Sequence, residues 1–205
     1  MKVCGTILAG GLARRMGGGD KILHKLAGRT ILDRTMARLQ PHCLALALNA
    51  NGDPARFATI GLPVIADSIE GFAGPLAGIL AGMDWCADTF PDADWLVTTP
   101  ADCPFLPEDF VPRLIGERAR SKADIVIAES GGRMHPVAAL WRVSLREALR
   151  SHLTQDGSRK VESWIKTQRW AAVRWSDDPY DPFFNVNTPE DRAIAEALIV
   201  KGLVA

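Results

Sequence analysis

Short apolar runs alternate with longer amphipathic stretches along the first two thirds of the chain. The apolar runs are bounded by turn residues and predict strands at residues 3–8, 44–48, 64–66, 95–98 and 125–128. The stretches between them have apolar positions three and four residues apart, which predicts helices at residues 30–39, 76–86 and 107–119. This alternation is typical of an α/β fold in which helices cover both faces of a mostly parallel sheet.

The last third of the chain is less regular, and we expect a mixed sheet edge there. Two adjacent glycines, Gly131 and Gly132, predict a tight turn. The apolar pattern predicts strands at residues 136–141 and 170–175 and helices at residues 144–152, 158–168 and 188–200. Thr188-Pro189-Glu190-Asp191 combines a capping residue, a proline and two acidic residues, which marks the start of the last helix.

The length and composition indicate one domain with a sizeable core. The chain has 205 residues, of which 47% are hydrophobic, and 24 basic residues balance 24 acidic ones. With no net charge, the chain has no overall field that would attract nucleic acid or an anionic membrane. No window approaches the roughly 20 apolar residues that span a bilayer, so we expect no membrane-spanning segment. Arg14 and Arg15 interrupt the apolar run at the N-terminus, which argues against a signal peptide, so we expect a cytoplasmic protein. We also expect a monomer.

The four cysteines have no metal-binding spacing. Cys4, Cys43, Cys86 and Cys103 are scattered, with no Cys-x-x-Cys pair and no histidine at zinc-site spacing. Cys4 lies in an apolar strand, and Cys103 lies beside a candidate site. We expect reduced thiols that act as small packing residues, and we assign neither Cys4 nor Cys103 a catalytic role.

A glycine-rich and cationic segment follows the first predicted strand. Residues 8–21 contain two glycine clusters, Arg14, Arg15 and Lys21. Glycines allow several N–H groups to approach one anion, while Arg15 and Lys21 supply positive charge around it. The spacing matches neither the P-loop nor the dinucleotide-binding motif. The segment therefore predicts a different triphosphate site, although Arg14 and Arg15 could also form a solvated pair on the loop.

Polar residues follow the other predicted strands as well. Asn49, Asp67 and Asp102 come after the second, third and fourth strands, and in open α/β sheets such positions meet at one edge. Asp102 stands between Pro100 and Pro104, which stiffen a short loop. One carboxylate of this kind is sufficient to bind Mg²⁺ together with phosphates and water. The alternative is that Asp102 caps a helix or an Asx turn.

The chain resembles the molybdenum cofactor guanylyltransferases, within the wider nucleotidyltransferase superfamily. No single motif carries this resemblance; the ordered set does. Its segments are Leu8-Ala9-Gly10-Gly11, Asn49-Ala50-Asn51, Val64-Ile65-Ala66-Asp67, Gly74-Pro75-Leu76-Ala77-Gly78-Ile79, Pro100-Ala101-Asp102-Cys103-Pro104-Phe105 and Phe184-Asn185-Val186-Asn187-Thr188-Pro189-Glu190-Asp191. The chain departs from the family at Ile22 and Leu23, where glycine or proline commonly follows the Asp-Lys pair.

The resemblance implies a Rossmann-like three-layer α/β sandwich with a mostly parallel, mixed central sheet, similar to the nucleotide-diphospho-sugar transferases. Within one domain, residues 1–105 would bind the nucleotide and residues 106–205 the acceptor. The implied enzyme uses Mg²⁺ to transfer GMP from GTP to the phosphate of molybdopterin, with release of pyrophosphate. Molybdoenzyme-maturation proteins are implied as further partners.

The resemblance also implies residue roles. Catalytic roles fall on Arg15, Lys21 and Asp102, of which Asp102 binds the metal ion. The positions that match the family's nucleotide-binding residues are Leu8, Ala9, Gly10, Gly11, Lys21, Asn49, Asp67 and Asp102. The positions that lie towards the pterin substrate in the family are His135, Asn185 and Asn187. Gly10 favours GTP, because the related cytidylyltransferases usually have alanine there.

Several alternatives stay open. His135 could be a buried, hydrogen-bonded histidine at a strand start, and Asn185 and Asn187 could satisfy the backbone of a turn. Within the enzyme class, a cytidylyltransferase or a sugar-phosphate nucleotidyltransferase of the same superfamily is the rival. A protein that binds the nucleotide and delivers the cofactor without turnover is the rival from another class.

Overall fold

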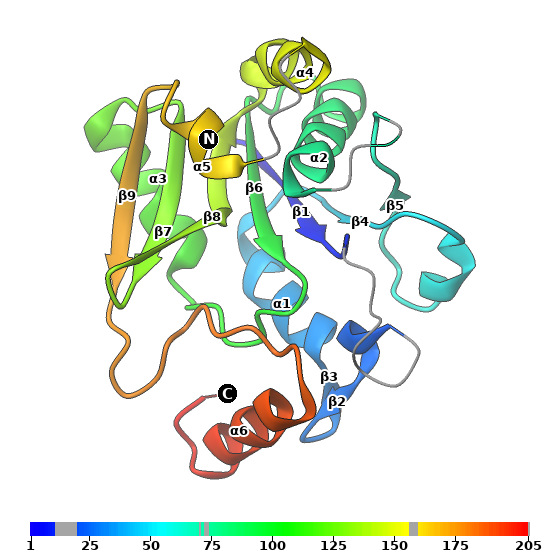
Figure 1. Cartoon of the computed structure of the whole chain (residues 1–205), viewed down its shortest axis with the longest axis vertical. Helices are drawn as coiled ribbons and strands as arrows, with labels where there is room; N and C mark the ends of the chain where they lie inside the picture. Colours follow the sequence, from blue (N-terminus) through cyan, green and yellow to red (C-terminus); the bar gives the residue numbers. More distant parts are fainter. Residues whose placement is uncertain (11–19, 70, 72–73, 156–159, 205) are drawn as a thin grey trace.

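The computed structural model describes residues 1–10, 20–69, 71, 74–155 and 160–204, which form a sheet with helices on both faces (Figure 1). The sheet order is β5-β4-β1-β6-β8-β7-β9. The bounds of these strands are β1 Val3–Leu8, β4 Leu46–Asn49, β5 Val64–Ile65, β6 Trp95–Pro100, β7 Ile125–Ser130, β8 Arg133–Arg142 and β9 Trp170–Trp175. A small antiparallel pair, β2 Lys25–Leu26 and β3 Arg29–Thr30, stands apart from this sheet.

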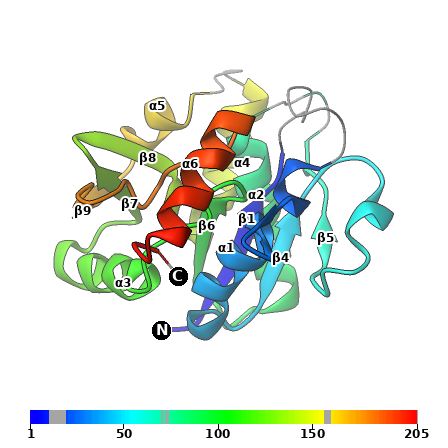
Figure 2. The ribbon, with the colours of Figure 1, turned by 90° about the horizontal axis from the view of Figure 1, so that it is seen from below.

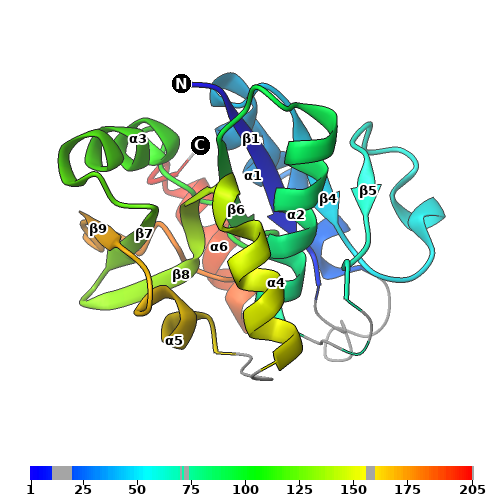
Figure 3. The ribbon, with the colours of Figure 1, turned by 90° about the horizontal axis from the view of Figure 1, so that it is seen from above.

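The helices form two layers. Their bounds are α1 Ile31–Leu39, α2 Pro75–Thr89, α3 Phe110–Ser121, α4 Arg146–Gln155, α5 Val161–Ile165 and α6 Pro189–Val200. Apolar residues of α1 and α3 pack on one face of the sheet, while those of α2, α4 and α5 pack on the other, where α2 and α4 lie side by side (Figure 3). The predicted three-layer α/β sandwich is confirmed.

The helix starts follow from local hydrogen bonds. The Thr30 hydroxyl oxygen accepts a hydrogen bond from the backbone N–H of Asp33, and the Thr30 N–H donates to the Asp33 carboxylate, which forms a capping box at the start of α1. Thr188 and Asp191 form the same arrangement at the start of α6. Both starts agree with the prediction.

Several predicted helices have different bounds. α2 and α4 end later than predicted, at Thr89 and Gln155. α3 begins at Phe110, three residues after Pro107, because Pro107 lies in a turn whose carbonyl accepts from the N–H of Phe110. The helix predicted at residues 158–168 is α5 alone in the described part of the chain. It ends early because the N–H groups of Thr167 and Gln168 bond three residues back, which tightens the chain before β9.

A third apolar cluster holds α6. Ala195 of α6 and Val186 are buried with Leu26, Ile31 and Phe105, away from the two faces of the main sheet. Figures 1 and 2 show α6 at the end of the molecule where β2 and β3 lie. Among the described residues, no helix has the length and apolar character needed to cross a membrane.

Strand β8 makes the sheet mixed, as expected. It pairs antiparallel with both β6 and β7, whereas the other neighbouring pairs of the main sheet are parallel. Its pairing with β7 shifts between Ile127, opposite Ala139, and Ala128, opposite His135. Residues 136–138 therefore bulge from the ladder, and Pro136 fits there because it has no N–H to donate.

Candidate active site

The ends of the parallel strands meet at one edge of the sheet. Leu8, the last residue of β1, lies in register with Asn49 of β4 on one side and Pro100 of β6 on the other. The N–H of Ala9 donates to the carbonyl of Asn49 over 2.8 Å, so Gly10 leaves the sheet beside Asn49. The structure therefore brings Leu8, Ala9, Gly10 and Asn49 together, as the strand pattern predicted.

Lys21 and Asp102 form an ion pair at this edge. Lys21 Nζ lies 2.6 Å from Asp102 Oδ2 and donates over 2.6 Å to Asn187 Oδ1. The side chains of Lys21 and Asp102 are 21% and 14% exposed, so the pair is sheltered but reachable. Residues 21, 102 and 187 thus form one cluster, although they belong to three distant parts of the chain.

The carboxylate of Asp102 has an unused oxygen. Asp102 Oδ1 is buried and has no hydrogen-bond partner, and Oδ2 accepts from Lys21. Among the described residues, the Asp102 side chain caps no helix and forms no Asx turn, so the alternative role as a capping residue finds no support. A buried carboxylate oxygen without a donor fits a divalent cation, and Mg²⁺ needs only one or two carboxylates. The described part of the chain contains no cluster of three or more acidic, histidine or cysteine ligands.

The turn that carries Lys21 is anchored by the residue that departs from the family pattern. Lys21–Leu23 form a 3₁₀ turn, and Ile22 is 4% exposed within the main apolar cluster. Burial of Ile22 fixes the backbone directly beside Lys21. The predicted site residues Gly11 and Arg15 lie outside the described residues.

Asn49, Asn51 and Asp67 form a second polar cluster. Asn49 is buried, and its Nδ2 donates to Asp67 Oδ1 over 3.0 Å and to the carbonyl of Ile65 over 3.2 Å. Asn51 Nδ2 donates to Asp67 Oδ2 over 2.7 Å, and its Oδ1 accepts from the Asp67 N–H over 2.9 Å. Asn49 and Asn51 together fix the orientation of the half-buried Asp67 carboxylate.

Arg56 connects this cluster with the Lys21 turn. Its Nη2 donates to the carbonyl of Asn51 over 2.9 Å, and its Nη1 lies 3.1 Å from Asp20 Oδ1. Asp20 directly precedes Lys21. Arg56 was not predicted from the sequence, because one arginine in a polar loop has no distinguishing pattern.

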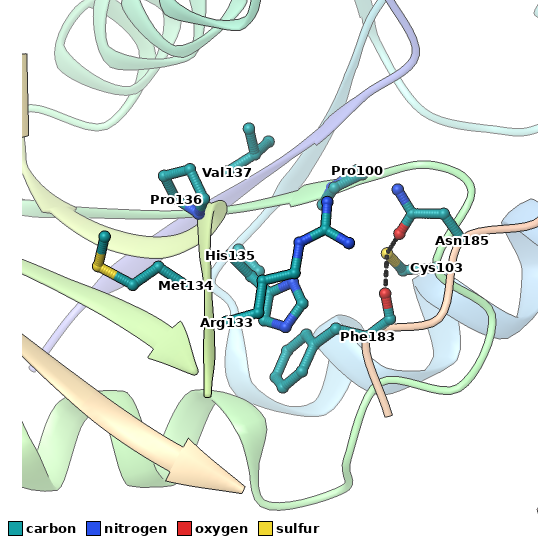
Figure 4. Close-up of a pocket in the computed structure, with 10 residues that line it drawn as sticks. Pro100, Cys103, Arg133, Met134, His135, Pro136, Val137, Phe183 and Asn185 are labelled. Carbon is teal, nitrogen blue, oxygen red and sulfur yellow. Dashed lines mark hydrogen bonds between the residues drawn. The ribbon is translucent and has the colours of Figure 1, made fainter. Parts of the chain in front are cut away.

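A pocket of about 190 Å³ lies beyond the end of β6, beside the bulge in β8 (Figure 4). Its wall is partly apolar and partly polar. The residues that line it are Pro100, Cys103, Arg133, Met134, His135, Pro136, Val137, Ala138, Phe183 and Asn185. Because β8 is antiparallel, its first residues lie where the parallel strands end, so the pocket adjoins the Lys21–Asp102 pair through Pro100 and Cys103.

Two contacts fix the His135 ring in this pocket. Its Nε2 lies 2.7 Å from Ser130 Oγ, which donates to Asp181 Oδ1 over 2.7 Å. The imidazole stacks on Phe183, with ring centroids 4.7 Å apart. Burial lowers the pKa of His135 below its usual value; Asp181 opposes this shift, and Arg133 adds to it.

The thiol of Cys103 contacts Asn185. Cys103 is buried, and its Sγ donates to Asn185 Oδ1 over 2.9 Å (Figure 4). Burial raises the pKa of the Cys103 thiol, and the charges of Asp102 and Asp181 raise it further. The thiol is therefore a protonated donor rather than a nucleophile, consistent with the packing role expected for this residue.

The structure thus separates the predicted acceptor residues. His135 and Asn185 line the pocket, whereas Asn187 bonds to Lys21. Ser130 and Asp181 were not predicted from the sequence. A serine directly before two glycines and an aspartate in a turn-rich loop both match ordinary turn residues.

Comparison with known proteins identifies relatives over nearly the whole chain. Residues 5–173 match the MobA-like NTP transferase domain family. A protein of Rhodopseudomonas palustris (strain BisB5), named molybdenum cofactor guanylyltransferase, is 57% identical over 196 residues, which cover 96% of this chain and 93% of the relative. A protein of the same name from Nitrobacter hamburgensis is 55% identical over 194 residues, covering 95% of this chain and 93% of the relative.

Solved structures show the same fold. Molybdopterin-guanine dinucleotide biosynthesis protein A from Archaeoglobus fulgidus superposes with a TM-score of 0.72 at 24% identity, covering 98% of this chain and 100% of that chain. A Mycobacterium tuberculosis protein in complex with manganese superposes with a TM-score of 0.69 at 16% identity, covering 96% of this chain and 98% of that one.

Proposed function

The chain belongs to the MobA-like NTP transferase family, and from this premise we propose that it transfers GMP from GTP to the phosphate of molybdopterin. The products are the guanine dinucleotide form of the molybdenum cofactor and pyrophosphate. In this reaction an oxygen of the acceptor phosphate forms a bond to the α-phosphorus of GTP, and the bond to the β-phosphate oxygen breaks.

The Lys21–Asp102 pair, with its unused carboxylate oxygen, is the observation that supports a transferase rather than a carrier protein. Charge accumulates on the transferring phosphoryl group and on the leaving pyrophosphate. Lys21 Nζ supplies positive charge at this position, and Asn187 Oδ1 orients it. Arg15, predicted to act with Lys21, remains a prediction.

Asp102 would bind Mg²⁺ through Oδ1, the oxygen that has no donor in the protein. When bound, the ion neutralises phosphate charge as the pyrophosphate departs. The matched family and the manganese-bound structural neighbour support a divalent ion, and the choice of Mg²⁺ is our proposal.

Residues 1–105 would hold the nucleotide, with Asp67 available for the ribose or the guanine edge. Residues 106–205 would supply the acceptor side, because the pocket lined by His135 and Asn185 opens beside Pro100. Its polar and apolar wall suits a heteroaromatic ring.

The reaction can be tested with purified protein, MgCl₂, GTP and molybdenum-loaded molybdopterin. We expect release of pyrophosphate that depends on the acceptor, and at least tenfold less release when CTP replaces GTP. Faster turnover with CTP would favour a cytidylyltransferase. Tight GTP binding without pyrophosphate release, under conditions in which an authentic guanylyltransferase turns over, would favour the carrier alternative.

A further inference from the structure

The direction of each hydrogen bond between His135, Ser130 and Asp181 follows from proton counting. Ser130 Oγ donates its single proton to Asp181 Oδ1. The same oxygen lies 2.7 Å from His135 Nε2 and can therefore only accept from it. The proton of the neutral imidazole is consequently on Nε2, which leaves Nδ1 as a hydrogen-bond acceptor.

Nδ1 of His135 is free to bind another group. Among the described residues none forms a hydrogen bond with it, and it is not one of the fully buried polar atoms that lack a partner. His135 lines the pocket, and Phe183 stacks against its ring (Figure 4). The N–H of Phe183 also donates to Asp181 Oδ1 over 2.9 Å, so Asp181 holds both the histidine and the segment stacked on it.

Asn185 and Arg133 supply donors to the pocket. Asn185 Oδ1 accepts from Cys103, so the amide offers its Nδ2 protons. Arg133 offers guanidinium protons and has no hydrogen-bond or ion-pair partner within the described ranges. The side chains of the pocket thus present an acceptor at His135 Nδ1 and donors on Asn185 and Arg133, which complements a ring edge carrying both N–H and carbonyl groups.

We propose that Ser130 and Asp181 are positioning residues that hold His135 in the Nε2–H tautomer, so that Nδ1 accepts a hydrogen bond from a ring N–H or amino group of the acceptor substrate. This inference rests on the proposed function, which places a pterin ring in the pocket. Asp181 acts through Ser130, because the carboxylate oxygen of Asp181 accepts the hydroxyl proton of Ser130. Without Asp181, that proton could turn towards Nε2.

The tautomer can be measured without any substrate. In protein labelled with ¹⁵N-histidine, a two-bond ¹H–¹⁵N spectrum at neutral pH should show a protonated Nε2 and an unprotonated Nδ1, with the signals assigned by their loss in His135→Gln. Asp181→Ala should abolish the preference for Nε2–H, whereas Asp181→Asn should keep it, because the amide oxygen still accepts from Ser130. An Nδ1–H tautomer in the unsubstituted protein would overturn the proposal.

Kinetics supply the second readout. Ser130→Ala should raise KM for molybdopterin about tenfold, the loss of one well-oriented hydrogen bond, and leave KM for GTP unchanged, whereas Ser130→Thr should retain both values. Equal changes for the two substrates, or a fall in kcat alone, would contradict the proposal. If the unsubstituted protein showed no turnover at all, the proposed function would fail, while the spectrum would still report on the tautomer.

Discussion

The proposed nucleotide side and the proposed acceptor side of this sheet edge are built in different ways. On the proposed nucleotide side, Asn49 ends a parallel strand and Asp67 and Asp102 follow two others, so the three residues lie at a shared edge. On the acceptor side, His135 comes from the beginning of an antiparallel strand, and Phe183 and Asn185 come from a late loop. A strand that runs in the opposite direction contributes its first residues to the edge where its neighbours contribute their last.

Because they are built differently, the two sides have separate structural supports and can be altered separately. The Asn49–Asn51–Asp67 cluster bonds within the β4–β5 region, whereas the His135–Ser130–Asp181 chain bonds β7 and β8 to the late loop. The Lys21–Asp102 pair joins the two sides. Variants should therefore divide into those that affect GTP, those that affect the acceptor and those that abolish transfer.

The largest effect is expected at the Lys21–Asp102 pair. Asp102→Asn removes the charge that faces Lys21 and would hold the metal ion, so kcat should fall by about 10³-fold, corresponding to roughly 4 kcal/mol of transition-state stabilisation. Pyrophosphate release measures this loss. Asp124→Asn is the matched control, because Asp124 is also ion-paired and only 13% exposed but precedes β7 at the opposite sheet edge. Equal losses in both variants would refute the assignment.

Substitutions at two glycines beside Asn49 distinguish an effect on packing from an effect on the choice of nucleotide. A Cβ on Gly78 would clash with Asn49 Oδ1, so Gly78→Ala should lower the free energy of unfolding by about 1–3 kcal/mol and raise KM for GTP. A Cβ on Gly10 would lie 3.7 Å from the same oxygen, so Gly10→Ala should leave stability unchanged and alter only the ratio of GTP to CTP turnover. Denaturant unfolding and competition kinetics measure the two effects, and an unstable Gly10→Ala protein would contradict the expectation.

A pair of arginine variants tests the separation directly. Arg133→Ala should raise KM for the acceptor about tenfold, because a charge-assisted contact is worth roughly 1.5 kcal/mol or more. Arg56→Ala should raise KM for GTP only a few-fold, since Arg56 acts on the nucleotide side through Asp20 and Asn51. Steady-state kinetics with each substrate varied would show the two effects. An Arg133→Ala protein with impaired GTP binding and normal acceptor binding would reverse the assignment of the two sides.

The smallest effect concerns stability at the opposite edge. The hydrogen bond and charge of Arg169, together with Arg142, lower the pKa of Asp124. The ion pairs therefore stabilise the fold above the usual carboxyl pKa, and this contribution is lost as the pH falls through the lowered value. Asp124→Asn should cost about 0.5–1 kcal/mol at neutral pH and approach zero cost in acid, because the arginines are exposed. Urea unfolding of both proteins at several pH values measures this difference. A destabilisation by Asp124→Asn that stays constant as the pH falls would contradict the prediction.

The sequence predicted correctly that Asn49, Asp67 and Asp102 lie at one edge of the sheet, because the ends of parallel strands meet there. It predicted the presence of β8 but not the shift between Ile127 and Ala128. Pro136 is compatible with a bulge, but a proline is equally compatible with the first residue of a strand, where the prediction placed it. It placed Asn187 with the acceptor, and the structure places the amide of Asn187 on Lys21. Contacts across 166 residues depend on how α6 docks, which local patterns do not encode.

The contact between Asn187 and Lys21 affects when this site can form during protein synthesis. Asn187 immediately precedes the capping box of α6, and its own N–H donates to Asp191 Oδ2 over 2.9 Å. While a ribosome is still translating the last helix, the nascent chain can fold its early strands but has no complete partner set for Lys21. The proposed Lys21 site is therefore complete only after Asn187 and the capping residues of α6 have left the ribosome.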